Sequence, residues 1–217
     1  MKKRFGYLFL TILLCFAMSP VFAGETEEGF VSLFNGKDLT GWTVQSGEAT
    51  YSVQDGAIVG LCKPGTKRNT FLVYKQEYGN FILKLDFKAI VSGNSGVQFR
   101  SHLRDEGKFQ RLFGYQCEID PSAKCETGRI YDEGRRGFQH KLIWLDRNTP
   151  ETLKPAQETY KAGDWNSLEI QCVGPSIRTW LNGVPVSNIF DYYDLSGLIG
   201  LQIHAGKQGS IAWRNIR

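Results

Sequence analysis

The sequence has few cysteines, and no two of them are spaced as Cys-x-x-Cys. Five occur in 217 residues, and Cys15 lies in the N-terminal apolar run. The spacing argues against zinc-ribbon and thioredoxin-like sites, and the count is low for a fold that depends on disulfides. Cys117 and Cys125 form the nearest pair. The sequence leaves open whether they form a disulfide or are free buried thiols.

Clusters of lysine and arginine are also missing. The formal net charge is +4, but Lys2, Lys3 and Arg4 precede the N-terminal apolar run. The rest of the chain is nearly neutral, so it lacks the basic surface that nucleic acids and anionic membranes require. With 41% hydrophobic and 22% charged residues, the composition is that of an ordinary globular protein. We expect no nucleic-acid partner.

The N-terminus has the three parts of a secretory signal peptide. Basic residues precede the apolar run Phe5–Met18, and Val21-Phe22-Ala23 provides a small-x-small cleavage site. The run is shorter than the roughly 20 residues that a membrane span needs. We therefore expect cleavage of residues 1–23, export to the periplasm or the medium, no membrane span after cleavage, and one domain over residues 24–217.

A sustained helical period is absent after residue 23. Short alternating stretches between glycine turns instead predict β-strands, including a hairpin at Asn182-Gly183 between Ile177–Leu181 and Val184–Val186. The other predicted strands are residues 51–53, 57–59, 71–74, 81–89, 96–101, 115–119, 128–131, 140–145, 167–173, 199–204 and 211–216. About a dozen strands without helices predict an all-β sandwich or jelly roll. Residues 146–164 are expected to form the longest loop, a candidate lid.

Three predicted strands carry an unusual polar face. Alternate residues of a strand point to opposite sides of a sheet. The polar positions are Gln98 and Arg100, then Gln116, Glu118 and Asp120, then Gln202 and His204. Exposed strands usually carry Thr, Lys and Glu, whereas these amides, carboxylates, guanidinium and imidazole suit a ligand rich in hydroxyls. We interpret the face as a sugar-binding surface. The alternative is an ordinary wetted face.

The densest charged segment is residues 129–137. It begins as a strand with Arg129 and Tyr131 on one side and then turns at Gly134. One interpretation is a solvated loop whose opposite charges pair. The other is a rim of donors and acceptors above a cleft, to which Tyr131, Glu133 and Arg135 would belong.

Glu118 and Asp120 are the strongest candidate for a catalytic carboxylate pair, since they lie about 6.6 Å apart along one face of a strand. Glu118-Ile119-Asp120 looks like part of the Glu-x-Asp-x-x-Glu motif of laminarinase-type glucanases. Ser122 and Ala123, however, stand where the second catalytic glutamate should be. A glucanase-like acid and nucleophile pair is therefore disfavoured.

Several short motifs follow one another in a familiar order. They are Leu33–Trp42, Asn94–Val97, Gly114–Asp120, Thr127–Tyr131, Gly163–Asn166, Leu181–Gly183, Gly200–His204 and Arg214–Ile216. Together they resemble the 3-keto-disaccharide hydrolase family over about residues 30–217. The resemblance implies a concanavalin A-like jelly-roll sandwich of two antiparallel sheets and an exported enzyme acting on oxidised sugars.

The chemistry of such substrates sets what the site needs. A ketone at C3 acidifies the C2 proton, so a base can remove it, the C1 substituent can leave, and water can add back. By residue type, His204 or Glu118 could be the base, Arg100 the enolate stabiliser, and Asp120 or Glu133 the acid. The residues expected to bind substrate are Asn94, Gln98, Gln116, Tyr131, Gln202 and Arg135.

Cofactor and partners follow from the same side chains. Glu118, Asp120 and His204 could also hold a divalent metal as a Lewis acid, although no cofactor is certain. The expected partner is a small oxidised di- or oligosaccharide or glycoside, with a functional link to a sugar 3-oxidoreductase. The competing function is a non-catalytic, lectin-like carbohydrate-binding module. Such a module stacks sugars on exposed aromatics, and the polar face offers only Tyr131, which favours the enzyme.

Overall fold

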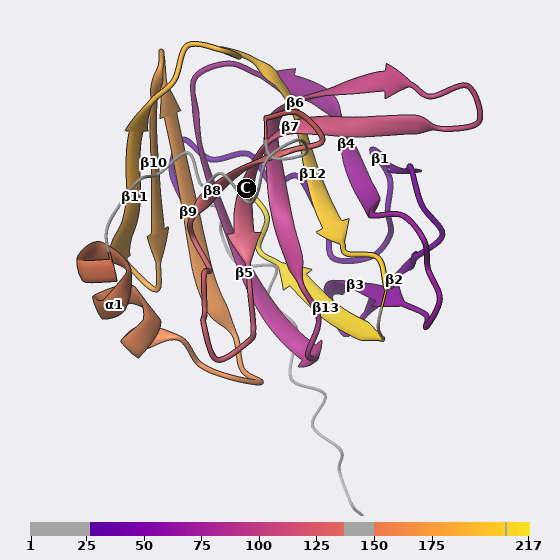
Figure 1. Cartoon of the computed structure of the whole chain (residues 1–217), viewed down its shortest axis with the longest axis horizontal. Helices are drawn as coiled ribbons and strands as arrows, with labels where there is room; N and C mark the ends of the chain where they lie inside the picture. The colour runs from indigo at the N-terminus through magenta and orange to yellow at the C-terminus, as the bar shows by residue number, and fades with distance from the viewer. Residues whose placement is uncertain (1–26, 137–149, 207) are drawn as a thin grey trace, which may run out of the picture.

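Two antiparallel β-sheets pack face to face in the computed structural model, which describes residues 27–136, 150–206 and 208–217 (Figure 1). The predicted all-β jelly-roll sandwich is confirmed. The elements in chain order are β1 (Trp42–Gln45), β2 (Thr50–Gln54), β3 (Ala57–Cys62), β4 (Thr70–Tyr78), β5 (Phe81–Val91), β6 (Ser95–Asp105), β7 (Gln110–Ile119), β8 (Ile130–Glu133), α1 (Pro150–Thr159), β9 (Asn166–Val173), β10 (Ser176–Leu181), β11 (Val184–Phe190), β12 (Gly197–Ile203) and β13 (Gly209–Arg214).

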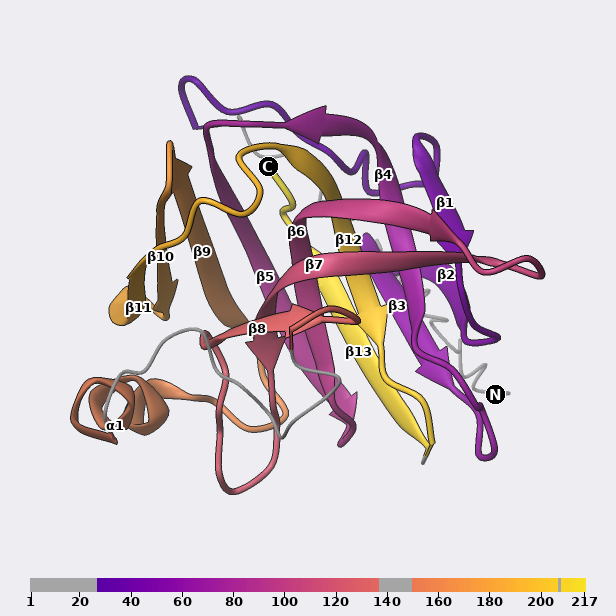
Figure 2. The ribbon, with the colours of Figure 1, turned by 45° about the horizontal axis from the view of Figure 1, so that its top comes forward.

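The order of strands brings distant parts of the chain together. The six-stranded sheet has the order β1-β4-β12-β6-β7-β8, and the seven-stranded sheet has the order β11-β10-β9-β5-β13-β3-β2. In the first sheet, β12 therefore lies between β4 and β6, although about a hundred residues separate it from them in sequence. Figure 2 shows β6, β7 and β8 side by side toward one edge of this sheet.

The core lies between the two sheets and follows the alternation of the strands. In β5, Leu83, Leu85 and Phe87 are buried, whereas the residues between them are more exposed. In β7 the core side is formed by Tyr115, Cys117 and Ile119. Burying one large apolar side chain contributes about 1.5–3 kcal/mol, so this alternation fixes the register of each strand.

The predicted hairpin is present between β10 and β11. Leu181 pairs with Val184 across the turn. Asn182 and Gly183 have φ angles of 50° and 81°, which is the left-handed pair of a type I′ turn. The asparagine–glycine signal therefore located this turn correctly.

The prediction of a loop over residues 146–164 is wrong for residues 150–159, which form α1 beside β10 and β11 (Figure 1). Over residues 153–159 of this short helix, Leu153 and Ala156, three positions apart, are the buried side chains. Two apolar positions are too few to show a helical period in the sequence. The predicted strand at 140–145 and residues 146–149 lie outside the described residues. In the described part of the chain, no helix is long and apolar enough to cross a membrane.

The four cysteines that the structure describes, Cys62, Cys117, Cys125 and Cys172, are buried, and no disulfide joins any two of them. Of the two alternatives, buried thiols without a Cys117–Cys125 disulfide are therefore correct. Burial raises the pKa of Cys125 and brings that of Cys172 to about 12. Because the thiolate is the reactive form, these side chains act as small apolar groups.

A β-bulge in β6 changes the direction of Arg100. The register between β6 and β7 shifts between Phe99 and His102, and Arg100 has a φ of 45°. Alternation predicted Arg100 beside Gln98, and that placement is wrong because the extra residue of the bulge turns the side chain away. The guanidinium is fully buried and donates to the carbonyl oxygens of Gly79 at 2.8 Å and Gly174 at 2.7 Å.

Arg100→Met should lower the free energy of unfolding by about 3 kcal/mol. The change removes the Arg100 donors from the half-buried carbonyls of Gly79 and Gly174, at about 1–3 kcal/mol for each unsatisfied group. Urea unfolding followed by tryptophan fluorescence measures the loss. The matched control is Arg104→Met, since Arg104 is exposed and pairs with Glu106 on the surface. A loss below about 1 kcal/mol for Arg100→Met would contradict this structural role.

Candidate active site

The outer face of the six-stranded sheet carries a polar cleft. Two adjoining cavities, of about 350 and 360 Å³, share Tyr131, Glu133 and His204 in their walls. We call the two together the cleft. Its walls come from β7 and β8, from one residue of β4, from His204 just after β12, and from the loops that adjoin β1, β4, β6 and β7. The predicted polar face is therefore hollowed at the point where these strands end.

Glu118, on β7, is the most perturbed carboxyl of the cleft. Only 6% of the residue is exposed, and its two oxygens accept hydrogen bonds from the Asn94 amide and from Gln116 Nε2, the latter at 2.9 Å. Burial raises the pKa of Glu118 from 4.5 to about 7, with smaller contributions from the charges of Asp120 and Glu133. A carboxyl with this pKa exchanges protons readily near neutrality, as a general base must.

Glu133, on β8, is the second buried carboxyl. It accepts hydrogen bonds from Asn69 Nδ2 and from an Arg111 terminal nitrogen, both at 3.3 Å. Burial raises the pKa of Glu133, while Arg111 and Asn69 partly oppose the rise. Tyr131 lies two residues earlier on the same strand and lines both cavities, and burial raises the pKa of its phenol. The cleft thus holds a second carboxyl and a phenol whose pKa values burial raises.

Three glutamines from adjacent strands lie beside Glu118. Gln98 Nε2 and Gln202 Nε2 donate to Gln116 Oε1 at 2.6 and 2.7 Å. Gln98 and Gln202 are completely buried, and only Gln116 lines the cleft. The structure therefore brings the three predicted residues together, but it places Gln98 and Gln202 behind Gln116.

His204 and Asp120 border the cleft from two loops. The His204 ring is exposed, and its Nδ1 lies 2.7 Å from the Ala205 carbonyl oxygen. The Asp120 carboxylate accepts hydrogen bonds from the backbone of Ser122 at 2.9 Å and of Glu126 at 3.2 Å, so it holds the loop after β7. The Asp120 carboxylate, which was predicted as an acid, therefore accepts hydrogen bonds within its own loop.

The predicted metal ligands do not form a metal site. Within residues 27–136, 150–206 and 208–217, no three His, Cys, Asp or Glu side chains are grouped so that they could hold a metal ion. Glu118, Asp120 and His204 line the same cavity, but the carboxylates are bound by amides and by backbone nitrogens.

Arg135 lies outside the cleft. Its guanidinium forms ion pairs with Asp132 at 2.9 Å and Asp194 at 2.6 Å and lies 4.1 Å from the centre of the Tyr193 ring. Arg135 therefore fits the first interpretation of residues 129–137, a segment whose opposite charges pair. Tyr131 and Glu133 fit the second, because they line the cleft. Of the predicted site residues, the structure separates Arg100 and Arg135 from the others.

Ten residues of the cleft wall were not predicted, among them Asn69, Arg111, Lys124 and Glu126. Asn69 and Arg111 hold Glu133, while Lys124 and Glu126 come from the loop that follows Glu118. The loop residues could have been found from their closeness in sequence to Glu118. Asn69 and Arg111 carry no such signal, because sheet pairing brings them to Glu133 from 64 and 22 residues away.

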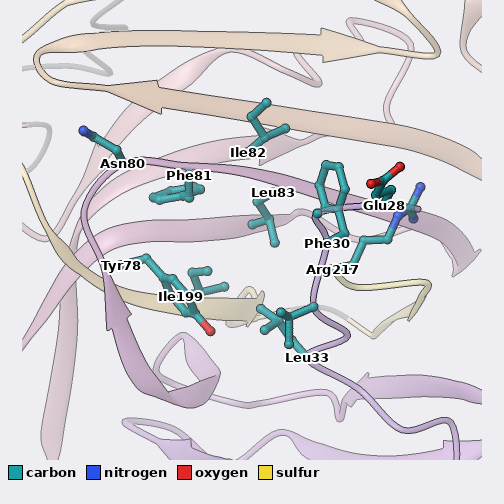
Figure 3. Close-up of a pocket in the computed structure, with 12 residues that line it drawn as sticks. Glu28, Phe30, Leu33, Tyr78, Asn80, Phe81, Ile82, Leu83, Ile199 and Arg217 are labelled. Atoms are coloured by element: carbon teal, nitrogen blue, oxygen red, sulfur yellow. The ribbon is translucent and has the colours of Figure 1, made fainter. Parts of the chain in front are cut away.

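A separate apolar cavity of about 350 Å³ opens elsewhere on the molecule (Figure 3). Its lining includes Phe30, Tyr78, Phe81 and Ile199, with Glu28 and Arg217 together at one end. No cluster of titratable groups comparable to that of the cleft lines it, so the cleft is the stronger candidate for chemistry.

Comparison with known proteins identifies the family. The model of the 3-keto-alpha-glucoside-1,2-lyase-like domain matches residues 29–217. The chain belongs to this family. The family resemblance seen in the sequence motifs is therefore correct, and a carbohydrate-related role is supported. Among curated proteins, none matches the chain.

Solved structures share the fold. A Parabacteroides distasonis protein, by name a glycosyl hydrolase, is 22% identical, with a TM-score of 0.55 over 85% of this chain and 90% of its own. Carbohydrate-binding module CBM66 from Bacillus subtilis is 16% identical, with a TM-score of 0.55 over 81% and 93%. An endo-β-galactosidase from Clostridium perfringens is 14% identical, with a TM-score of 0.55 over 88% and 63%. At these identities the likeness shows the fold alone.

Glu118→Gln should remove a pH-dependent loss of stability. Because the pKa of Glu118 is raised on folding, its favourable contribution is complete below about pH 4.5 and is lost as the pH rises through 7. At about 1.4 kcal/mol per pKa unit, the free energy of unfolding of wild type should fall by about 3 kcal/mol relative to that of Glu118→Gln between pH 4 and 9. Urea unfolding at several pH values measures this difference, and Glu77→Gln, an exposed site, is the control. Parallel pH profiles for wild type and Glu118→Gln would contradict the raised pKa.

Proposed function

We propose that the protein cleaves the glycosidic bond of 3-keto-glycosides and 3-keto-disaccharides by elimination and hydration. The observation that carries this proposal is the buried Glu118 carboxyl, whose pKa of about 7 suits the removal of a weakly acidic carbon-bound proton. Membership of a family described by a 3-keto-glucoside 1,2-lyase supports the same reaction class.

In the first half of the reaction, the Glu118 carboxylate takes the proton from C2, and the electrons of that bond form an enolate with the C3 ketone. The cleft offers two groups for the enolate oxygen, the ammonium of Lys124 and the phenol of Tyr131. They take the place that the sequence suggested for Arg100, whose guanidinium is bound to turn carbonyls. Such donors stabilise the charge that develops on oxygen.

In the second half, the enolate re-forms the ketone, a double bond forms between C1 and C2, and the bond from C1 to the leaving oxygen breaks. Glu133, whose pKa is also raised, gives a proton to that oxygen. Water then adds to C1 while Glu133 takes a proton from it, and Glu118 returns its proton to C2. One water is consumed, and both carboxyls return to their starting forms. His204, exposed at the cleft, would bind substrate hydroxyls or share the acid role.

Incubation of the protein with 3-keto-trehalose or a 3-keto-glucoside should release the free sugar and the aglycone, while the unoxidised sugars remain intact. Glu118→Gln and His204→Ala should each lower turnover at least tenfold without loss of folding. Because Glu118 must be ionised to act as the base, the pH dependence of the rate should include an ionisation near 7 that is absent in Glu118→Gln. Product release followed by NMR measures all three results.

Two outcomes would reject this proposal. Inactivity on every keto sugar, combined with glycan binding, would identify a carbohydrate-binding module instead. Full activity of both Glu118→Gln and His204→Ala would show that the reaction takes place elsewhere. Glu77→Gln again serves as the matched control for loss of one carboxylate.

We also propose that the protein is exported and that a sugar 3-oxidoreductase supplies its substrate, because a C3 hydroxyl must be oxidised before this elimination is possible. The basis for export is the signal-like segment over residues 1–23. Expression of the full chain in a Gram-negative host should give a periplasmic or secreted product that begins at Gly24, as measured by N-terminal sequencing. A cytoplasmic product that begins at Met1 would contradict export.

A further inference from the structure

The hydrogen bonds around Gln116 all run in one direction. Ser101 Oγ donates to Gln98 Oε1 at 2.9 Å, and Gln98 Nε2 donates to Gln116 Oε1. Gln202 Nε2 donates to the same oxygen, and Gln116 Nε2 donates to Glu118 Oε2. The last acceptor of this chain of amides is the Glu118 carboxylate.

We propose that Gln98 and Gln202 are positioning residues, which hold the Gln116 amide in the orientation that presents its NH₂ group to Glu118. The reason lies in the two donors on Gln116 Oε1. If the amide turned over, its NH₂ group would face two other NH₂ groups, and both buried hydrogen bonds would be lost. An amide has only one acceptor oxygen, so the two donors leave a single favourable orientation.

The backbone provides the space for this arrangement. Gln98 pairs with Gln116 across β6 and β7, while Gln202 pairs with Gly96 across β12 and β6. A β-carbon on Gly96 would lie 2.6 Å from the Gln116 side chain. The absence of a side chain at Gly96 therefore lets Gln116 extend across β6 and reach Gln202.

Gln202 has a feature that a purely structural amide rarely shows. Its Oε1 is buried and has no hydrogen-bond partner among the described residues, although its Nε2 is bound to Gln116. Burying an unpaired carbonyl oxygen is unfavourable. The residue is therefore placed for the bond it donates, and turning its own amide over would remove that bond.

The consequence for Glu118 is electrostatic. The other charged or titratable groups of its cavity are Asp120, Lys124, Glu126, Tyr131, Glu133 and His204. Burial and the neighbouring carboxylates disfavour the ionised form, while the amides of Asn94 and Gln116 favour it. A displaced Gln116 amide would therefore raise the pKa of Glu118 further and leave less of the base ionised at neutral pH.

The test is the titration of Glu118 in the full chain, followed by NMR of ¹³C-labelled glutamate and assigned with Glu118→Gln. Wild type should titrate near 7. Gln98→Met and Gln202→Met should each raise this pKa by about half a unit or more, and Gln116→Met should raise it at least as far. When Gln98→Met or Gln202→Met is combined with Gln116→Met, the pKa of Glu118 should be no higher than in Gln116→Met alone, because both residues act through Gln116. Gln171→Met, on the seven-stranded sheet, is the matched control.

An unchanged Glu118 pKa in Gln98→Met and Gln202→Met, or shifts that add in full to Gln116→Met, would overturn the proposal. A second measurement needs no variant of the glutamines. In wild type, the side-chain NH₂ signals of Gln116 should titrate with the pKa of Glu118, and constant signals would overturn the orientation. The catalytic meaning of this arrangement rests on the proposed function, but neither measurement does. Inactivity on keto sugars with a normal titration would reject only the function.

Discussion

The Gln116 side chain extends over Gly96 of the neighbouring strand, where a β-carbon would lie 2.6 Å from it. This close approach depends on the in-register pairing of β12, β6 and β7, which aligns Gln202 with Gly96 and Gln98 with Gln116. Because the three amides bond to one another, polar groups can be buried on the sheet with most of their hydrogen bonds satisfied. From this layer the Gln116 amide donates to Glu118 and partly opposes the rise in the Glu118 pKa that burial causes.

Glu118 and Glu133 are both buried in the cleft, but their hydrogen-bond partners differ. Both Glu118 and Glu133 have raised pKa values because they are removed from water. Glu118 is bound by neutral amides, whereas Glu133 is bound by an amide and by the guanidinium of Arg111. Two carboxyls held differently in one site can divide the tasks of base and acid. The side chains that line the cavity around Glu118 are all polar or ionisable, which suits a ligand rich in hydroxyl groups.

Strand alternation predicted the polar face because it depends only on local geometry. Gln98, Gln116, Glu118 and Gln202 share one face, since regular strands repeat every two residues. Arg100 was misplaced because the bulge adds one residue to β6, and no turn residue in the sequence marks it. Helix α1 was missed because, over residues 153–159, it buries no side chains besides Leu153 and Ala156. Asn69 and Arg111 reach Glu133 through sheet pairing, which a single sequence does not specify.

In the proposed reaction, Glu118 removes the proton from C2 of a 3-keto sugar. A 3-keto sugar without a substituent to cleave at C1, such as 1,5-anhydro-3-keto-glucitol, isolates this step, because the C2 proton can exchange but there is no glycosidic bond to break. In D₂O, wild-type protein should accelerate the replacement of the C2 hydrogen by deuterium, measured by NMR, and Glu118→Gln should exchange it at least tenfold more slowly. Exchange no faster than without protein, or equally fast in Glu118→Gln, would contradict the account.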